Sequence, residues 1–302
     1  MTAQTASAAV AGTWLLGDMR VNRIGFGAMR LTGSAPFHRG TPSDRDRVLG
    51  VLRQAVALGV NHIDTAAFYF SQLRSANELI NSALSPYPDD LVIATKVGPG
   101  RDASGGWSAP ARPDELRGQV EENLRQLGRD HLDLVNLRVM DGQDSIAEHF
   151  GALAELRGAG LIRHLGVSGI RPHHLAEARA IAPVVCVQNR YGIDAREDEE
   201  LLVRDCGAQG IAVVPFFSVA GDGRATGATG SESQEILAVA RAHGASPAQV
   251  RLAWTLQRGA HLLVIPGTGD PDHLAENVAA GALRLTEQEM AHLSGGRATL
   301  SP

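Results

Sequence analysis

The chain has 302 residues, of which 44% are hydrophobic and 20% charged, and its formal net charge at pH 7 is −5. This much apolar sequence can bury a sizeable core, which excludes a disordered or collagen-like protein. The weak negative charge gives no general attraction to nucleic acid or anionic lipid, and no apolar run reaches the ~18 residues of a membrane-spanning helix. We therefore expect neither a nucleic-acid nor a membrane partner. Two unclustered cysteines, Cys186 and Cys206, favour a reducing, cytoplasmic environment.

The amino-terminal segment 1–12 lacks the basic and apolar regions of a signal peptide, so we expect it to be a flexible tail. Residues 13–302 show no linker and no break in composition, which predicts a single domain. Within it, residues 13–22 are typical of a β-hairpin with a Gly-Asp turn.

After the hairpin, short apolar runs alternate with amphipathic helical patterns. The predicted strands are 24–29, 60–64, 90–98, 132–139, 162–168, 184–189, 211–217 and 262–267. The predicted helices are 43–59, 75–84, 112–128, 145–160, 171–182, 196–210, 231–244, 246–259 and 270–281.

Eight apolar strands, each followed by a helix, indicate a parallel sheet covered by helices. Their number and the length of the chain favour an α/β protein with a closed (β/α)8 TIM barrel and an amino-terminal hairpin. An open doubly wound sheet is the alternative fold.

Reactive groups of such a barrel sit where the strands end. The polar residues at these positions are Asp64 with Tyr69 just beyond it, Lys96, Arg138, Ser168, Gln188, Asn189 and Thr268.

Lys96 is the one lysine among 28 basic residues, and it ends an apolar strand. An ammonium anchored by Asp64 should favour the ionised form of a nearby phenol, so we expect a lowered pKa for Tyr69. Such a phenol can protonate the oxygen of a carbonyl group as the carbonyl takes up a hydride. The alternative is a structural ion pair between Asp64 and Lys96, with Tyr69 as a loop aromatic and the single lysine a matter of chance.

Arg138 is a second cation at the carboxyl-terminal end of the predicted barrel strands. It can hold a substrate oxygen or an anionic ring substituent. Alternatively, it pairs with Asp141 or ends its strand in solvent.

The sequence shows no metal-ligand spacing. Residues 265–277 combine Pro-Gly-Thr after a strand with a helix start near Pro271, where free amides would suit a phosphate. A plainly capped helix is the alternative. The glycine-rich segment 216–227 is long enough to clamp a pyrophosphate or to be a mobile loop.

The chain resembles the aldo-keto reductases. The resemblance rests on HIDTAAFY (62–69), IATKVG (93–98), HLGVSG (164–169), VCVQNRY (185–191) and IPGT…HLAEN (265–277), and it extends from about residue 13 to 293. It implies a (β/α)8 barrel that binds NADPH, with NADH not excluded, at the strand ends and reduces aldehydes and ketones. The expected partner is therefore a small-molecule carbonyl substrate, and the chain is expected to act as a monomer or small homo-oligomer.

The resemblance assigns roles to individual residues. Tyr69 matches the acid, Lys96 and Asp64 its support, and Arg138 completes the expected catalytic set. Ser168 and Gln188 match the residues that bind the nicotinamide carboxamide, and Phe216 matches the aromatic that stacks on the ring. The full expected cofactor site is Gly27, Met29, Asp64, Ser168, Gln188, Phe216, Phe217, Ser218, Pro266, Gly267, Thr268, His273, Glu276 and Asn277. The expected substrate contacts are Met29, Phe70 and Arg138.

Several positions depart from the family pattern. Arg138 replaces a histidine, Gly169 replaces an asparagine and Phe70 replaces a glycine. The basic pair that usually grips the 2′-phosphate falls on Gly267 and His273, with Asp270 and Asp272 nearby.

With Arg138, the segments LVNLRVM, VVPFF and LLVIPGT are similar to bacterial NADPH-dependent pyridoxal reductases, which convert pyridoxal to pyridoxine in vitamin B6 salvage. Arg138 could bind the anionic 3-oxygen of pyridoxal. The expected function is thus an NAD(P)H-dependent carbonyl reductase. A redox-neutral lyase or dehydratase, or a nucleotide-sensing module with slow chemistry, are the alternatives.

Overall fold

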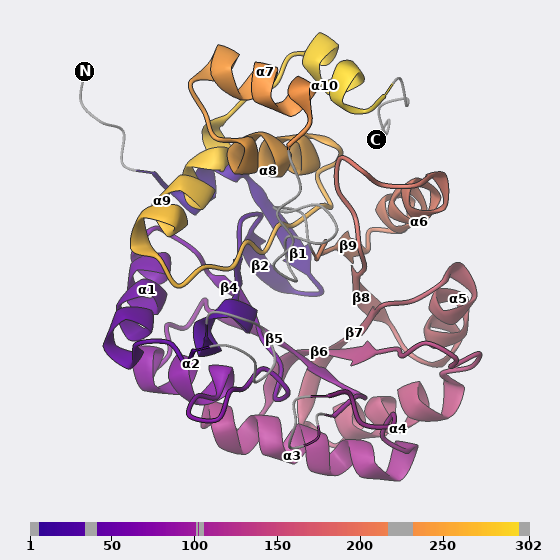
Figure 1. Cartoon of the computed structure of the whole chain (residues 1–302). Helices are drawn as coiled ribbons and strands as arrows, with labels where there is room; N and C mark the ends of the chain where they lie inside the picture. Colours follow the sequence, from indigo (N-terminus) through magenta and orange to yellow (C-terminus); the bar gives the residue numbers. More distant parts are fainter. Residues whose placement is uncertain (1–5, 34–40, 101, 103–105, 217–231, 296–302) are drawn as a thin grey trace.

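The computed structural model describes residues 6–33, 41–100, 102, 106–216 and 232–295. Seven parallel strands form one sheet in chain order, β3-β4-β5-β6-β7-β8-β9, and helices surround it (Figure 1). The strands are β3 (Phe26–Gly27), β4 (His62–Asp64), β5 (Val92–Val97), β6 (Leu132–Arg138), β7 (Ile162–Ser168), β8 (Val184–Gln188) and β9 (Ala212–Val213). The predicted α/β class and (β/α)8 barrel are confirmed.

The segment 262–264 closes the sheet into a barrel. Val264 pairs with Ile24 on one side, and Leu262 pairs with Val213 on the other. The predicted eighth strand, 262–267, is therefore present only as isolated bridges. Pro266 has no N–H to continue a ladder of hydrogen bonds. At the next residue the two backbones approach closely, since a Cβ on Gly267 would lie 2.3 Å from the Gly27 carbonyl oxygen.

The predicted hairpin is confirmed as β1 (Thr13–Leu16) and β2 (Met19–Asn22), paired antiparallel. Leu16, Met19 and Val21 belong to the apolar cluster that fills the barrel interior. Asp18 in the turn accepts hydrogen bonds from His164 at 2.6 Å and from Arg163 at 2.9 Å. The hairpin thus closes the amino-terminal end of the barrel and leaves the carboxyl ends of the strands for a site.

Helices follow the strands at the predicted places. They are α1 (Arg45–Ala57), α2 (Ala76–Leu84), α3 (Leu116–Leu127), α4 (Ala147–Gly158), α5 (Pro172–Ile181), α6 (Glu197–Ala208), α7 (Gln234–His243), α8 (Pro247–Gln257) and α9 (Pro271–Ala279). Several begin at side-chain caps: Asp44, Ser75 and Ser246 each accept a hydrogen bond from a first-turn amide. The apolar faces of the helices pack against the outer face of the sheet in a second, larger core cluster.

Two further features, outside the barrel strands, differ from the prediction. Within the expected flexible tail, Ala8–Ala11 form a 3-10 helix, and the Ala8 amide donates to the Leu58 carbonyl at 2.8 Å with Ala8 fully buried. The structure also contains α10 (Glu287–Leu293), which was not predicted from the sequence and lies beside α7 on the outside of the barrel (Figure 1). Among the described residues, no helix is long and apolar enough to cross a membrane.

Candidate active site

Lys96 occupies the centre of the candidate site, and its side chain is almost completely buried. Its ammonium donates to Asp64 Oδ1 at 2.6 Å and to the Thr65 carbonyl at 2.9 Å. It also forms a side-chain hydrogen bond with Tyr69, and Nζ lies 4.8 Å from the centre of the Tyr69 ring. The three residues predicted from strand ends are therefore in contact.

The expected direction of the Tyr69 pKa is wrong. Burial raises the pKa of Tyr69, and although the charge of Lys96 lowers it, the balance is a rise above the ordinary value. Tyr69 is 9% exposed, so the phenolate loses most of its hydration. The phenol is therefore protonated at neutral pH, as a proton donor must be.

Lys96 is held in its charged form. Burial alone would lower the pKa of Lys96, but the charges of Asp64 and Tyr69, with their hydrogen bonds, raise it overall. A fixed ammonium beside Tyr69 can stabilise the phenolate that remains once the proton has left.

A chain of polar contacts leads from this group across the barrel mouth. Gln188 Nε2 donates to Asp64 Oδ2 at 2.8 Å, and the Ser168 hydroxyl lies 3.4 Å from Gln188 Oε1. Arg138 Nη1 lies 3.4 Å from the Ser168 hydroxyl oxygen. Strands β4, β6, β7 and β8 thus bring together residues that are up to 124 positions apart.

Arg138 is half-buried at the end of β6. Its guanidinium carbon lies 5.2 Å from the centre of the Phe216 ring, and its charge also interacts with Tyr69. Burial lowers the pKa of Arg138. The charge of Asp141 acts in the opposite direction, but the described residues include no carboxylate within ion-pair distance of Arg138. The alternative of a direct Arg138–Asp141 pair is thus not observed.

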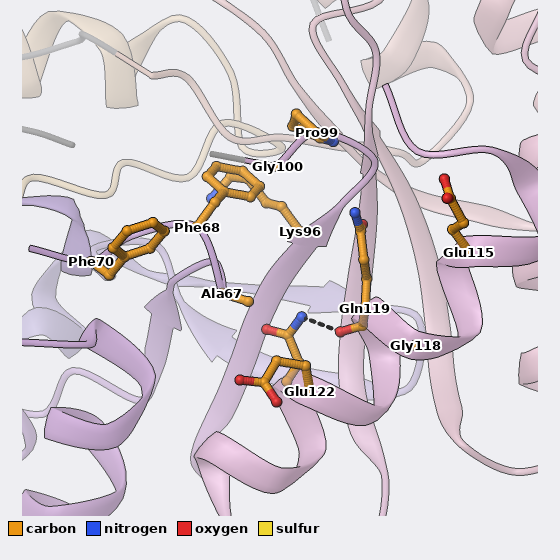
Figure 2. Close-up of a pocket in the computed structure, with 11 residues that line it drawn as sticks. Ala67, Phe68, Phe70, Lys96, Pro99, Gly100, Glu115, Gly118, Gln119 and Glu122 are labelled. Carbon is orange, nitrogen blue, oxygen red and sulfur yellow. Dashed lines mark hydrogen bonds between the residues drawn. The ribbon is translucent and has the colours of Figure 1, made fainter. Parts of the chain in front are cut away.

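A cavity of about 330 Å³ opens on the α3 side of Lys96 (Figure 2). Phe68 and Phe70 line it from the loop after β4, while Gln119 and Glu122 line it from α3. Trp107 packs edge-on against Phe68, with 5.4 Å between ring centres. Of the three expected substrate contacts, Phe70 lines this cavity, whereas Met29 and Arg138 do not.

The start of α9 does not have the free amides expected for a phosphate site. The Asp270 carboxylate accepts hydrogen bonds from the amides of Asp272 at 2.9 Å and His273 at 3.1 Å. Asp270 also pairs with Arg47 from α1. A capping aspartate therefore satisfies these donors, and Arg47 is a cation near this end that the sequence analysis missed.

The other expected cofactor residues that the structure describes lie in the segments 27–29 and 266–277. The backbones of Gly27 and Gly267 approach closely, since a Cβ on either would meet backbone of the 24–27 or 265–267 segment. Pro266 and Asn277 are buried, whereas Met29, Thr268 and Glu276 are half-buried and His273 is exposed. Glu276 accepts a hydrogen bond from the Ser246 hydroxyl. Phe217 and Ser218 lie outside the described residues, as does most of the glycine-rich segment 216–227.

Two residues near Lys96 were not predicted from the sequence. The backbone carbonyl of Thr65 accepts a hydrogen bond from Lys96, so the side-chain type at this position gave no signal. Asn136 pairs with Lys96 in the sheet register and is 1% exposed, with no hydrogen-bonding partner for its amide atoms among the described residues. An asparagine inside the apolar run LDLVNLRV was a visible signal. No group of three potential metal-ligating residues occurs in the described ranges.

Comparison with known proteins places this geometry in a family. The aldo/keto reductase family model matches residues 23–295. Pyridoxine 4-dehydrogenase of Escherichia coli is 45% identical over 94% of this chain and 97% of its own length. An uncharacterized oxidoreductase of Schizosaccharomyces pombe is 36% identical over 97% of this chain and 94% of its own length.

A solved aldo-keto reductase from Klebsiella pneumoniae, in complex with NADPH, has the same fold. It is 26% identical, the match covers 91% of each chain, and the TM-score is 0.73. The family match extends over nearly all of the chain and includes every strand end described above. The chain belongs to the aldo/keto reductase family and is an NADP-dependent oxidoreductase that acts on carbonyl groups.

Proposed function

We propose that this chain reduces the aldehyde of pyridoxal, or of a similar 3-hydroxypyridine aldehyde, to the alcohol with NADPH. The observation that carries the proposal is the contact of buried Lys96 with both Asp64 and Tyr69. Arg138, whose charge also interacts with Tyr69, supplies a cation for a substrate oxygen. The similarity to a pyridoxine 4-dehydrogenase supports the same class of substrate.

The donor set at the mouth fits a nicotinamide. Ser168 offers a hydroxyl and Gln188 an amide, which are groups that pair with a carboxamide, and the half-buried Phe216 ring offers a face for stacking. When bound, NADPH supplies the hydride. The remaining expected contacts to the dinucleotide, from Gly27 to Asn277, stay part of this proposal.

In the proposed reaction Tyr69 is the general acid. The carbonyl carbon accepts the hydride, the carbonyl π electrons move to oxygen, and the Tyr69 hydroxyl donates its proton to that oxygen. The products are the alcohol, oxidised cofactor and a Tyr69 phenolate. Lys96 stabilises the phenolate through its charge, and Asp64 keeps Lys96 in place.

Arg138 is proposed to anchor the substrate. The 3-oxygen of pyridoxal is largely anionic and adjacent to the aldehyde. The Arg138 guanidinium, whose charge interacts with Tyr69, can bind the 3-oxygen while Tyr69 protonates the aldehyde oxygen. We also propose that residues 13–302 act as one domain in a reducing, cytoplasmic compartment, consistent with two buried free thiols.

The test is to follow NADPH absorbance with pyridoxal and with pyridine-4-carbaldehyde, which keeps the ring and aldehyde but lacks the 3-oxygen together with the 2-methyl and 5-hydroxymethyl groups. Stoichiometric conversion of pyridoxal to pyridoxine, with higher kcat/KM than for the second aldehyde, is the expected result. Absence of NADPH binding at sub-millimolar concentration would instead favour a redox-neutral lyase. Tight NADPH binding with negligible turnover on any aldehyde would favour a nucleotide sensor.

A further inference from the structure

Gly169, the residue directly after β7, leaves a space that the Arg138 guanidinium occupies. A Cβ placed on Gly169 would lie 2.6 Å from Arg138 Nη1 and 2.9 Å from Arg138 Cζ. It would also lie 3.1 Å from the Val139 carbonyl oxygen. Any side chain at position 169 would therefore displace the guanidinium from its present place.

The sheet explains why these two residues meet. Arg138 on β6 is the register partner of Ser168 on β7, so its side chain runs alongside the last residue of β7 and reaches Gly169. The guanidinium lies over the Phe216 ring, 5.2 Å from ring centre to Cζ. The guanidinium is thus bounded by Ser168, the bare Cα of Gly169 and an aromatic face.

The same guanidinium retains unused donors. Its one hydrogen bond to a described side chain is the 3.4 Å contact with Ser168, and no carboxylate among these residues neutralises it. A half-buried guanidinium that interacts with Tyr69 and has no carboxylate within ion-pair distance among the described residues favours an anionic atom beside it.

From this geometry we infer that Gly169 determines substrate specificity: by carrying no side chain, it keeps Arg138 at the mouth, where it selects carbonyl substrates with an anionic oxygen beside the reacting group. This inference rests on the carbonyl reduction proposed above, and it assigns Gly169 a positioning role that acts through Arg138.

Asparagine is the informative replacement. Gly169 has φ +69°, a left-handed conformation that most side chains rarely adopt. Asparagine tolerates this region better than other non-glycine residues, so Gly169→Asn can keep the backbone while filling the space of the guanidinium. Gly160 has φ +82°, and a Cβ added there would meet no atom within 4 Å, so Gly160→Asn offers a matched control.

The experiment compares wild type, Gly169→Asn, Arg138→Met, the double variant and Gly160→Asn. For each, kcat/KM is measured with pyridoxal and with pyridine-4-carbaldehyde. Gly169→Asn and Arg138→Met should each lower kcat/KM for pyridoxal about 10- to 100-fold, the range of a hydrogen bond between charged groups. The loss of kcat/KM for pyridine-4-carbaldehyde in these two variants should be at least about fivefold smaller than the loss for pyridoxal, and Gly160→Asn should match wild type with both aldehydes.

The double variant separates positioning from a general structural effect. If Gly169 acts through Arg138, adding Gly169→Asn to Arg138→Met should cause no further loss. An undiminished preference for pyridoxal in Gly169→Asn, or a further loss in the double variant, would overturn the inference.

A binding measurement keeps this inference separate from the proposed function. Calorimetry with 4-deoxypyridoxine, which keeps the 3-oxygen but cannot be reduced, should show binding to wild type and at least about tenfold weaker binding to Gly169→Asn and Arg138→Met. Reduction of neither aldehyde by wild type would refute the proposed function, whereas equal 4-deoxypyridoxine affinity in wild type and both variants would refute the role of Gly169.

Discussion

Lys96 and Asp64 form an ion pair inside the barrel, with 2.6 Å between Nζ and Oδ1 and side-chain exposures of only 6% and 4%. Removing one partner leaves the other charge buried, which is far more costly than breaking a surface pair. The pair also holds the ammonium that hydrogen-bonds Tyr69, so both stability and catalysis should depend on it.

Asp64→Asn and Lys96→Met should each destabilise the protein by about 3–5 kcal/mol, because each leaves one buried charge uncompensated. The double variant should recover most of that stability, since neither charge remains, yet reduce carbonyls as poorly as Lys96→Met. Urea denaturation and NADPH-linked turnover measure the two effects. A double variant no more stable than the single ones would contradict the pairing.

The direction of the Tyr69 pKa predicts the pH dependence of the reaction. Because burial raises the pKa of Tyr69 above its ordinary value of 10.0, the phenol stays protonated through the neutral range. Carbonyl reduction should therefore stay level up to about pH 10, and oxidation of the alcohol, which needs the phenolate, should keep rising with pH. Rates with NADPH and with NADP+ across pH 6 to 10.5 provide the measurement. A fall in reduction centred near pH 8 would indicate that Lys96 outweighs burial.

Asp270 is expected to oppose binding of the cofactor 2′-phosphate. Hydrogen bonds from the His273 and Asp272 amides lower the pKa of Asp270, so its carboxylate is charged at neutral pH. Asp270→Asn keeps a helix cap but removes the charge, and should tighten NADPH binding several-fold while changing NADH binding little. Fluorescence titration with both cofactors measures this, with Asp272→Asn as the neighbouring control. Equal gains for NADPH and NADH would show that the 2′-phosphate is not involved.

His62 should make stability depend on pH. Burial lowers the pKa of His62 to about 4, against 6.5 in the unfolded chain; Asp64 raises this pKa and Lys96 lowers it. Between these values the unfolded chain binds a proton that the folded chain does not, so stability should fall as pH is lowered from 6.5 to 4. The full effect is on the order of 3 kcal/mol.

Denaturation at several pH values, for wild type and His62→Leu, tests this dependence. The variant should lose that part of the dependence of the unfolding free energy on pH. Any change in packing would instead shift its stability equally at every pH. A slope that His62→Leu leaves intact would show that other groups are responsible.

The sequence was sufficient for the fold and for most of the central site. Val, Ile and Leu runs between amphipathic helices predicted the barrel, and the charged end of an otherwise apolar strand indicated Lys96. Asp64, Tyr69 and Gln188 follow because parallel strands bring their carboxyl ends to one rim.

The remainder depended on three-dimensional contacts. The pKa direction of Tyr69 is decided by burial, which spacing along the chain does not report. The Arg138–Gly169 contact arises between neighbouring strands whose register no single segment specifies. The sequence left open whether the start of α9 offers free amides or is capped, and the hydrogen bonds to Asp270 decide in favour of the cap.

The central claim is that Tyr69 donates the proton, and Tyr69→Phe tests it most directly. Tyr87→Phe is the control, since the Tyr87 hydroxyl donates to the Leu127 carbonyl at 2.7 Å, outside the site. Single-turnover NADPH oxidation with pyridoxal should slow about 10²- to 10⁴-fold in Tyr69→Phe, with NADPH affinity nearly unchanged and Tyr87→Phe close to wild type. Reduction by Tyr69→Phe at the wild-type rate would contradict the account.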